Sequence, residues 1–247
     1  MSWIYLSPHL DDAVLSCGGM IWEQVHSGEH VQIWTICAGD PPPGDLSPFA
    51  ELLHSIWKTG REAVAIRRRE DMQACQKLGA KPRYFDIPDC IYRVEPQSGQ
   101  PVIEGEEDLF KPLKEQDRLL ASSWSSRLEK LPHSDARVVC PLTIGRHVDH
   151  SLTRVMAEMK FHPLLYYADY PYIARSENSV HNWLKDGTSY KREITPDGLR
   201  AWQDAISCYG SQISTFWNSL DEMNIAIRSY WEKGGGSELW QHPLPME

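Results

Sequence analysis

The chain has 247 residues, of which 41% are hydrophobic, and it carries a formal charge of −9 at pH 7. This length and apolar content can build one large α/β domain, and we expect a single domain over residues 1–247. The acidic balance excludes a protein that binds the nucleic-acid backbone, because that affinity requires clustered lysine and arginine.

Short apolar runs rich in β-forming residues alternate with longer segments of helical period. Strands are predicted at residues 3–6, 31–37, 83–87, 136–140 and 164–168. Helices are predicted at 13–27, 49–78, 108–130 and 148–159, with a C-terminal helical pair at 198–209 and 213–233. This alternation predicts an α/β fold with a mostly parallel sheet flanked by helices.

Two stretches rich in proline and glycine interrupt this pattern. Residues 38–48 (AGDPPPGDLSP) contain three consecutive prolines and are predicted to form a loop after the second strand. Residues 93–108 are predicted to form a second loop or a short hairpin. Inside the first helix, Gly18 and Gly19 each cost about 1 kcal/mol relative to alanine, so we expect this helix to pack closely on the sheet.

The sequence contains no membrane-spanning candidate. No run reaches the roughly 18 apolar residues of a membrane helix, and the N-terminus lacks the features of a secretory signal. The six cysteines form no C-x-x-C pair, and we expect them to be reduced thiols. These features predict a cytoplasmic protein, and they leave open whether it forms a homo-oligomer.

Candidate metal ligands follow two of the predicted strands. Ligands of open parallel sheets bind beyond the carboxyl ends of the strands. His9 and Asp12 follow the first strand, and His147 and His150 repeat their three-residue spacing after the strand that ends at residue 140. Either half alone also fits a helix N-cap, but two halves on one sheet edge favour a metal site.

Two imidazoles and one carboxylate with an open position are typical of catalytic zinc, and we assign His9, Asp12 and His150 as ligands. The same ligand types also suit Fe²⁺ or Co²⁺.

Three motifs resemble those of the LmbE-like or PIG-L family of zinc-dependent de-N-acetylases, which act on N-acetylated amino sugars. SPHLDDAVLSCGG at residues 7–19 is similar to the family's P-H-P-D-D-E motif, and GRHVDH at 145–150 matches H-x-D-H. RRREDMQACQKLG at 67–79 fits the family's R-x-x-E-x-x-x-A-x-x-x-L-G helix. The resemblance covers roughly the first 150 residues and implies a Rossmann-like fold with the metal at the strand ends.

The same resemblance implies roles for individual residues. Asp11 becomes the general base, His9, Asp12 and His150 hold zinc, and His147 stabilises the transition state. Ser16 and Arg67 fall on positions that contact substrate. The chain departs from the family in two places, because Ala13 replaces a glutamate and Gly145 stands where some members have a tyrosine.

Four further interpretations accompany this assignment. Asp149 is expected to orient one imidazole. His147, when protonated, is expected to donate to the oxyanion, although it also suits a fourth metal ligand. Arg146 is a candidate to polarise the substrate carbonyl in part, as the tyrosine does in the family members that have it. Asp89 is a candidate for binding sugar hydroxyls, and a turn residue beside Pro88 explains it equally well.

Together these features predict a zinc hydrolase that removes an N-acetyl group from a small amino-sugar conjugate of the N-acetylglucosamine type. An amidase acting on a related sugar or thiol conjugate uses the same site. A metal-containing sugar-binding module without turnover and an iron(II) oxygenase are the alternatives from other classes.

Overall fold

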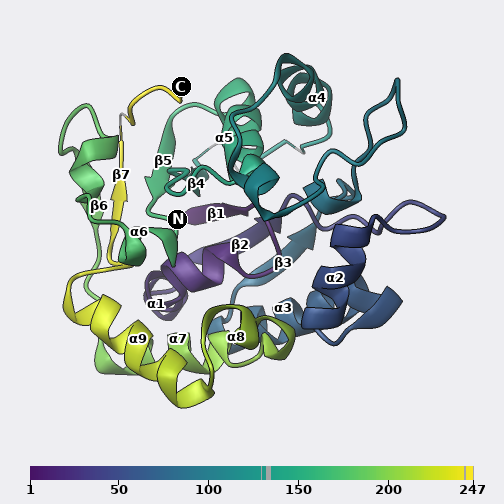
Figure 1. Ribbon diagram of the computed structural model, residues 1–247. Coiled ribbons are helices and arrows are strands. Elements are labelled where there is room, and N and C mark those ends of the chain that lie inside the picture. Colours follow the sequence, from purple (N-terminus) through teal and green to yellow (C-terminus); the bar gives the residue numbers. More distant parts are fainter. Residues whose placement is uncertain (129, 132–134, 242, 247) are drawn as a thin grey trace.

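The computed structural model describes residues 1–128, 130–131, 135–241 and 243–246 (Figure 1). Within these residues, a seven-stranded sheet has the order β3-β2-β1-β4-β5-β7-β6. Strands β1 to β5 are parallel, whereas β7 pairs antiparallel with both β5 and β6. The strands are β1 Ser2–Ser7, β2 His30–Thr35, β3 Lys81–Tyr84, β4 Arg137–Pro141, β5 Leu164–Tyr167, β6 Ser189–Lys191 and β7 Glu238–Trp240.

Helices cover both faces of the sheet, which gives three layers (Figure 1). Helices α1, α3, α7 and α9 lie on one face, and α4 and α5 lie on the other. The α-helices are α1 Asp12–His26, α2 Pro48–Ile56, α3 Ala63–Leu78, α4 Glu115–Ser125, α5 Val148–Lys160, α6 Tyr172–Arg175, α7 Pro196–Ile206, α8 Gly210–Phe216 and α9 Leu220–Glu232. Short 3₁₀ helices are η1 Gly60–Glu62, η2 Cys90–Tyr92, η3 Glu106–Phe110 and η4 Val180–Trp183.

Strand β1 shows why the N-terminal run is apolar at every position. Trp3 and Tyr5 pack into the core beneath α1 and α7, while Ile4 and Leu6 pack into the core beneath α5. A parallel strand with helices on both sides buries both of its faces, so its sequence does not alternate. The predicted α/β fold with a mostly parallel sheet is therefore confirmed.

Several predicted element bounds were wrong. Strand β3 occupies 81–84 rather than 83–87. The segment 49–78 forms α2 and α3 instead of one helix, because Lys58 (φ 55°) and Gly60 (φ 53°) adopt left-handed conformations between them. The segment 213–233 is likewise divided into α8 and α9, where the Ser219 side chain accepts from Glu222 N at 3.1 Å and caps the second helix.

Within the segment 108–130, residues 108–110 belong to η3 and only α4, which begins after Pro112, is α-helical in the described residues; residue 129 lies outside them. A hydrogen bond of 2.8 Å from Lys114 N to Asp117 Oδ2 fixes this start. Strands β6 and β7 were not predicted, since runs of three residues are too short for alternation to be recognised. Residues 93–108 form the expected excursion, with a bridge between Val94 and Pro101.

Two further sequence expectations concern thiols and membrane helices. All six cysteines are free, and five of them are buried. Among the described helices, none combines the length and the apolar content needed to cross a bilayer.

Gly18 lets α1 approach α7 rather than the sheet. A Cβ atom at Gly18 would lie 2.3 Å from Trp202 Cδ1, and Trp202 itself donates a hydrogen bond to Val14 O at 2.7 Å. We expect Gly18→Ala to lower the free energy of unfolding by about 1–3 kcal/mol through overpacking, despite the better helix propensity of alanine. Urea denaturation measures this, with Gly105→Ala, which has open space, as control. Equal stability of both variants would contradict the close packing.

Candidate metal and catalytic site

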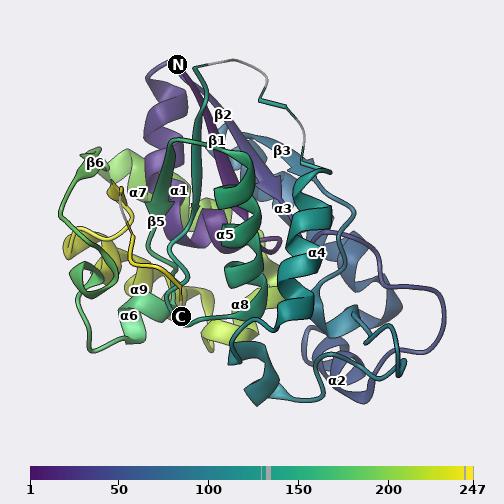
Figure 2. The ribbon, with the colours of Figure 1, turned by 90° about the horizontal axis from the view of Figure 1, so that it is seen from above.

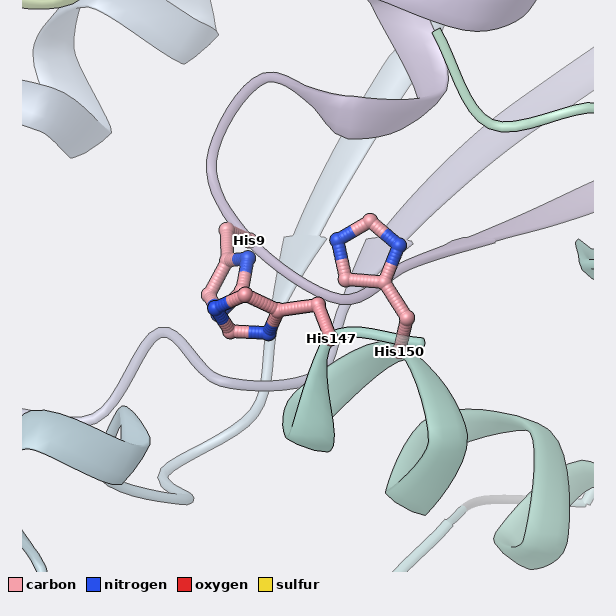
Figure 3. Close-up of side chains that lie close together, drawn as sticks. All are labelled: His9, His147 and His150. Atoms are coloured by element: carbon pink, nitrogen blue, oxygen red, sulfur yellow. The ribbon is translucent and has the colours of Figure 1, made fainter. Parts of the chain in front are cut away.

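The sheet has a topological switch point between the neighbouring strands β1 and β4. From β1 the chain builds β2 and β3 on one side and later β4 and β5 on the other. Loops that follow two such strands diverge and leave a crevice at the point of reversal. His9 lies in the loop after β1, and His147 and His150 lie at the start of α5 after β4, with their rings close together (Figure 3).

Asp12 joins two of these imidazoles. Its Oδ2 lies 3.1 Å from His9 Nδ1, and its Oδ1 lies 3.3 Å from His150 Nε2. Ligand atoms around a tetrahedral zinc ion, with bonds of about 2.0–2.1 Å, are roughly 3.3 Å apart. The Asp12 carboxylate therefore lies at metal-ligand spacing from each imidazole, while the three histidines His9, His147 and His150 are a set whose ligand atoms lie within 4.8 Å of one another.

The alternative interpretation, that these residues are helix N-caps, holds for only one of the two halves of the site. Asp12 is the first residue of α1, but its carboxylate accepts from His9 N at 2.7 Å, and it is Ser7 Oγ that accepts from the first-turn Ala13 N at 3.0 Å. His147, in contrast, is the N-cap of α5, and its Nδ1 accepts a hydrogen bond from Asp149 N at 3.2 Å. The cap interpretation therefore describes His147 and not Asp12.

Buried carboxylates hold the outer nitrogens of both imidazoles. His9 Nε2 lies 3.1 Å from Asp149 Oδ2, and His150 Nδ1 lies 2.7 Å from Asp169 Oδ1. Asp149 also pairs with Arg93, and Asp169 accepts from Ile144 N at 3.0 Å. Carboxylates in this arrangement fix the tautomer and the orientation of metal-binding histidines.

The cluster favours positive charge. Although burial opposes it, His150 and His9 hold the pKa of Asp12 well below its usual range. Burial lowers the pKa of a histidine, yet Asp12 and Asp169 raise the pKa of His150 to about 9. The same field that stabilises a proton on these rings stabilises a metal cation bound by their neutral forms.

Asp11 differs from its neighbour Asp12. It is buried, and its Oδ2 lies 3.6 Å from Arg67 Nη2, whose guanidinium stacks on Trp57. Burial and the adjacent Asp12 charge raise the pKa of Asp11 to about 7, with Arg67 and His9 acting in the opposite direction. A carboxylate with this pKa is suited to exchange a proton near neutral pH.

His147 is neutral in this environment. Burial and the neighbouring His9 and His150 hold the pKa of His147 well below its ordinary value. Since Nδ1 accepts the hydrogen bond from Asp149 N, the proton of the neutral ring is assigned to Nε2. The expectation of a protonated His147 is therefore replaced by a neutral imidazole that donates from Nε2.

Of the four residues predicted to contact substrate, two line the cavity that contains the cluster and two do not. Arg67 and Asp89 line the cavity that contains the cluster. Asp89 also caps η2 by accepting from Ile91 N at 3.2 Å, so it satisfies its turn interpretation as well. Ser16 is buried behind the cavity and accepts from Tyr170 N at 3.1 Å. Arg146 is exposed and lines neighbouring cavities instead.

Tyr172 occupies the space beside Gly145. A Cβ atom on Gly145, which has φ 89°, would lie 2.4 Å from Tyr172 Cδ1. The Tyr172 ring meets His150 edge-on at 5.7 Å and lines the same cavity. A side chain at position 145 is thus excluded by a tyrosine that enters from α6.

Sequence reasoning did not identify Arg93 or the contact between Asp169 and His150. Asp169 lies two residues after the end of β5, and that position at the crevice is the one signal that points to it. Arg93 lies in the loop after η2, where no spacing links it to Asp149.

The site cavity, as we call it, has a volume of about 500 Å³. Eight buried polar residues line it, and we call them its floor: His9, Asp11, Asp12, Arg67, Asp89, His147, His150 and Gln212. Helices α2, α6 and α8 gather beyond this end of the strands, opposite the N-terminus (Figure 2). A volume of this size accommodates a small organic molecule.

Comparisons with known proteins show what the whole chain resembles. The chain is 29% identical to 2'-N-acetylparomamine deacetylase of Niallia circulans over 205 residues, 75% of this chain and 71% of that protein. The structure resembles the zinc-inhibited form of teicoplanin deacetylase Orf2, with a TM-score of 0.79, 26% identity and coverage of 98% and 97% of the two chains. It also resembles the A40926 pseudoaglycone deacetylase Dbv21, with a TM-score of 0.70, 27% identity and coverage of 97% and 96%. Residues 4–159 match the profile described as PIG-L, GlcNAc-PI de-N-acetylase, and the chain therefore belongs to this family.

Proposed function

We propose that this N-deacetylase removes the acetyl group from an amino sugar within a small conjugate of the N-acetylglucosamine type. One observation carries the proposal: the Asp12 carboxylate lies 3.1 Å from His9 Nδ1 and 3.3 Å from His150 Nε2, while a second carboxylate, Asp11, lines the same cavity. A metal-dependent hydrolase combines a metal site with a proton acceptor for the attacking water.

The protein residues divide the chemistry between them. When bound by His9, Asp12 and His150, a divalent metal lowers the pKa of a water molecule and polarises a carbonyl group. Asp11 accepts the proton of the attacking water and passes it to the leaving amine. The neutral His147 donates from Nε2 to the oxygen that becomes negative, a contribution of about 3–4 kcal/mol in comparable oxyanion sites.

Other side chains orient the residues that would bind the metal and the substrate. Asp149 and Asp169 hold the two metal-binding imidazoles by their outer nitrogens. Arg67 binds the substrate beside Asp11, and Asp89 at the cavity wall accepts hydrogen bonds from sugar hydroxyls. We assign no substrate contact to Ser16 or Arg146, since neither side chain lines the site cavity.

We infer that the metal is zinc. Two imidazoles and one carboxylate suit zinc, and they also suit Fe²⁺ or Co²⁺. One structural relative is described in a zinc-inhibited form, which makes metal stoichiometry a variable to control. A cytoplasmic location accords with six free cysteines.

The test is acetate release by protein of defined metal content. The chelated protein is reconstituted with one equivalent of Zn²⁺, Co²⁺ or anaerobic Fe²⁺ and given a panel of N-acetylated glucosamine conjugates. We expect acetate and free amine in equal amounts from the metal-loaded protein and none from the chelated protein.

Three outcomes would overturn this function. Sugar binding without acetate would indicate a binding module. Oxygen consumption by the iron form would indicate an oxygenase. Release of another acyl group or of a thiol conjugate, in place of acetate, would indicate a different amidase.

A further inference from the structure

One face of α2 forms an apolar wall of the site cavity. Phe49, Leu52, Leu53 and Ile56 are spaced i, i+3, i+4 and i+7, and all four line the cavity. Leu52 is 54% exposed and Ile56 is 45% exposed. Ala50 and His54 are buried, and Phe49 and Leu53 also pack against the core. Leu52 and Ile56 are therefore not needed to attach the helix to the core.

Two other elements continue this surface toward the metal cluster. Leu109 and Phe110 from η3 and Phe216 from α8 line the same cavity. The Phe110 ring meets the His147 ring edge-on at 5.8 Å, so the apolar surface reaches the reacting groups. We call the seven side chains the apolar wall: Phe49, Leu52, Leu53, Ile56, Leu109, Phe110 and Phe216.

Charge distinguishes the floor of the cavity from this outer part. The buried charged groups Asp11, Asp12, Arg67 and Asp89 lie at the floor. Among the described lining residues farther out, Glu106 and Arg175 have opposite signs and leave no net charge. Exposed apolar side chains that cluster at a cavity, rather than scatter singly, mark a binding surface.

Resting on the proposed deacetylation, we propose that the apolar wall binds an uncharged apolar aglycone, an alkyl or aryl group attached to the N-acetylated sugar. The acetyl group must reach the metal cluster and Asp11, which fixes the sugar at the floor of the cavity. Substituents on that sugar then extend outward along α2. The seven side chains of this wall offer a polycationic aglycone no carboxylate and no hydrogen-bond acceptor. Beside them, Glu106 is the single carboxylate among the described lining residues outside the floor, and Ser214 and Thr215 supply hydroxyls.

The experiment uses metal-loaded enzyme and a series of N-acetylglucosaminides with methyl, butyl, hexyl and octyl groups, below their micellar concentrations. We expect kcat/KM to rise by up to about fourfold for each methylene that becomes buried. The double variant Leu52→Ser with Ile56→Ser should lose most of this dependence and keep the methyl glycoside rate within about twofold. A glycoside with a cationic aminoalkyl group should gain nothing over the methyl glycoside.

A matched control is Met72→Ser with Ile225→Ser. These side chains are 53% and 70% exposed, and neither lines the site cavity. The control should keep the full chain-length dependence. If both double variants flatten it equally, or if the wild type shows none while hydrolysing the methyl glycoside, the proposal is overturned.

Calorimetric binding of the same glycosides separates this inference from the deacetylation itself. Binding that strengthens with chain length but without turnover would contradict the proposed deacetylation and still support the apolar aglycone site. Self-association, or sedimentation with phospholipid vesicles, that the α2 double variant abolishes would assign the wall to a second copy or to a membrane. Either result, without dependence on the aglycone, would overturn the proposal.

Discussion

Replacing Asp11 with asparagine is expected to lower kcat for acetate release by about 10²- to 10⁴-fold while the metal content stays unchanged. Asparagine keeps the size of the side chain but cannot accept a proton from water. Asp12 and both imidazoles keep their mutual contacts, because no direct hydrogen bond from the Asp11 carboxylate holds them. Steady-state kinetics and elemental analysis of the same sample measure the two quantities.

The pH dependence gives a second readout for Asp11. A general base acts in its deprotonated form, so kcat/KM rises as pH rises through its pKa. Burial and Asp12 raise the pKa of Asp11 to about 7, and a bound cation displaces it downward. We therefore expect the acid limb of the wild type at or below about pH 7. The exposed Asp221→Asn is the control, and an Asp11→Asn enzyme that loses metal in proportion to activity would contradict the role.

Replacing His150 with alanine is expected to remove the metal and, with it, the activity. His150 supplies the nitrogen that lies 3.3 Å from Asp12 Oδ1. Loss of an outer-sphere partner typically weakens metal binding by about 10- to 100-fold, and loss of a direct ligand should exceed this. Competition with a chromophoric chelator measures the affinity.

The control for His150→Ala is His54→Ala. His54 is also a buried histidine, and its Nε2 lies 2.6 Å from Tyr92 Oη, outside the cluster. This control should keep the metal. If His147→Ala releases the metal and His150→Ala does not, then His147 is the ligand and our assignment is wrong. Thermal unfolding of each chelated variant shows whether the protein is still folded.

Local sequence signals predicted the strands of the parallel sheet and the two segments that meet at its edge. His9 lies in the short loop after β1 and His147 at the end of the loop between β4 and α5, so the strand positions determine where they lie. The partners of these residues could not be found in this way. Asp169 and Arg93 meet them only through the packing of distant loops, and no spacing in the chain records that packing.

The errors in the helices have a local physical cause. The segment 49–78 was predicted as one helix, yet Lys58 and Gly60 adopt left-handed conformations that divide it. The resulting break matters for function, because it gives α2 a direction independent of α3. A tripeptide strand such as β6 is stabilised by its neighbour β7 rather than by its own sequence.

The contacts of the cluster also bear on the stability of the fold. His9 contacts Asp149 across 140 residues of chain, and His150 contacts Asp169 in the segment after β5. We expect an ion bound by both segments to link the two halves of the sheet. Because such an ion binds the folded chain and not the unfolded one, it stabilises the fold by an amount that grows with its concentration, about 2.7 kcal/mol at one hundred times its dissociation constant.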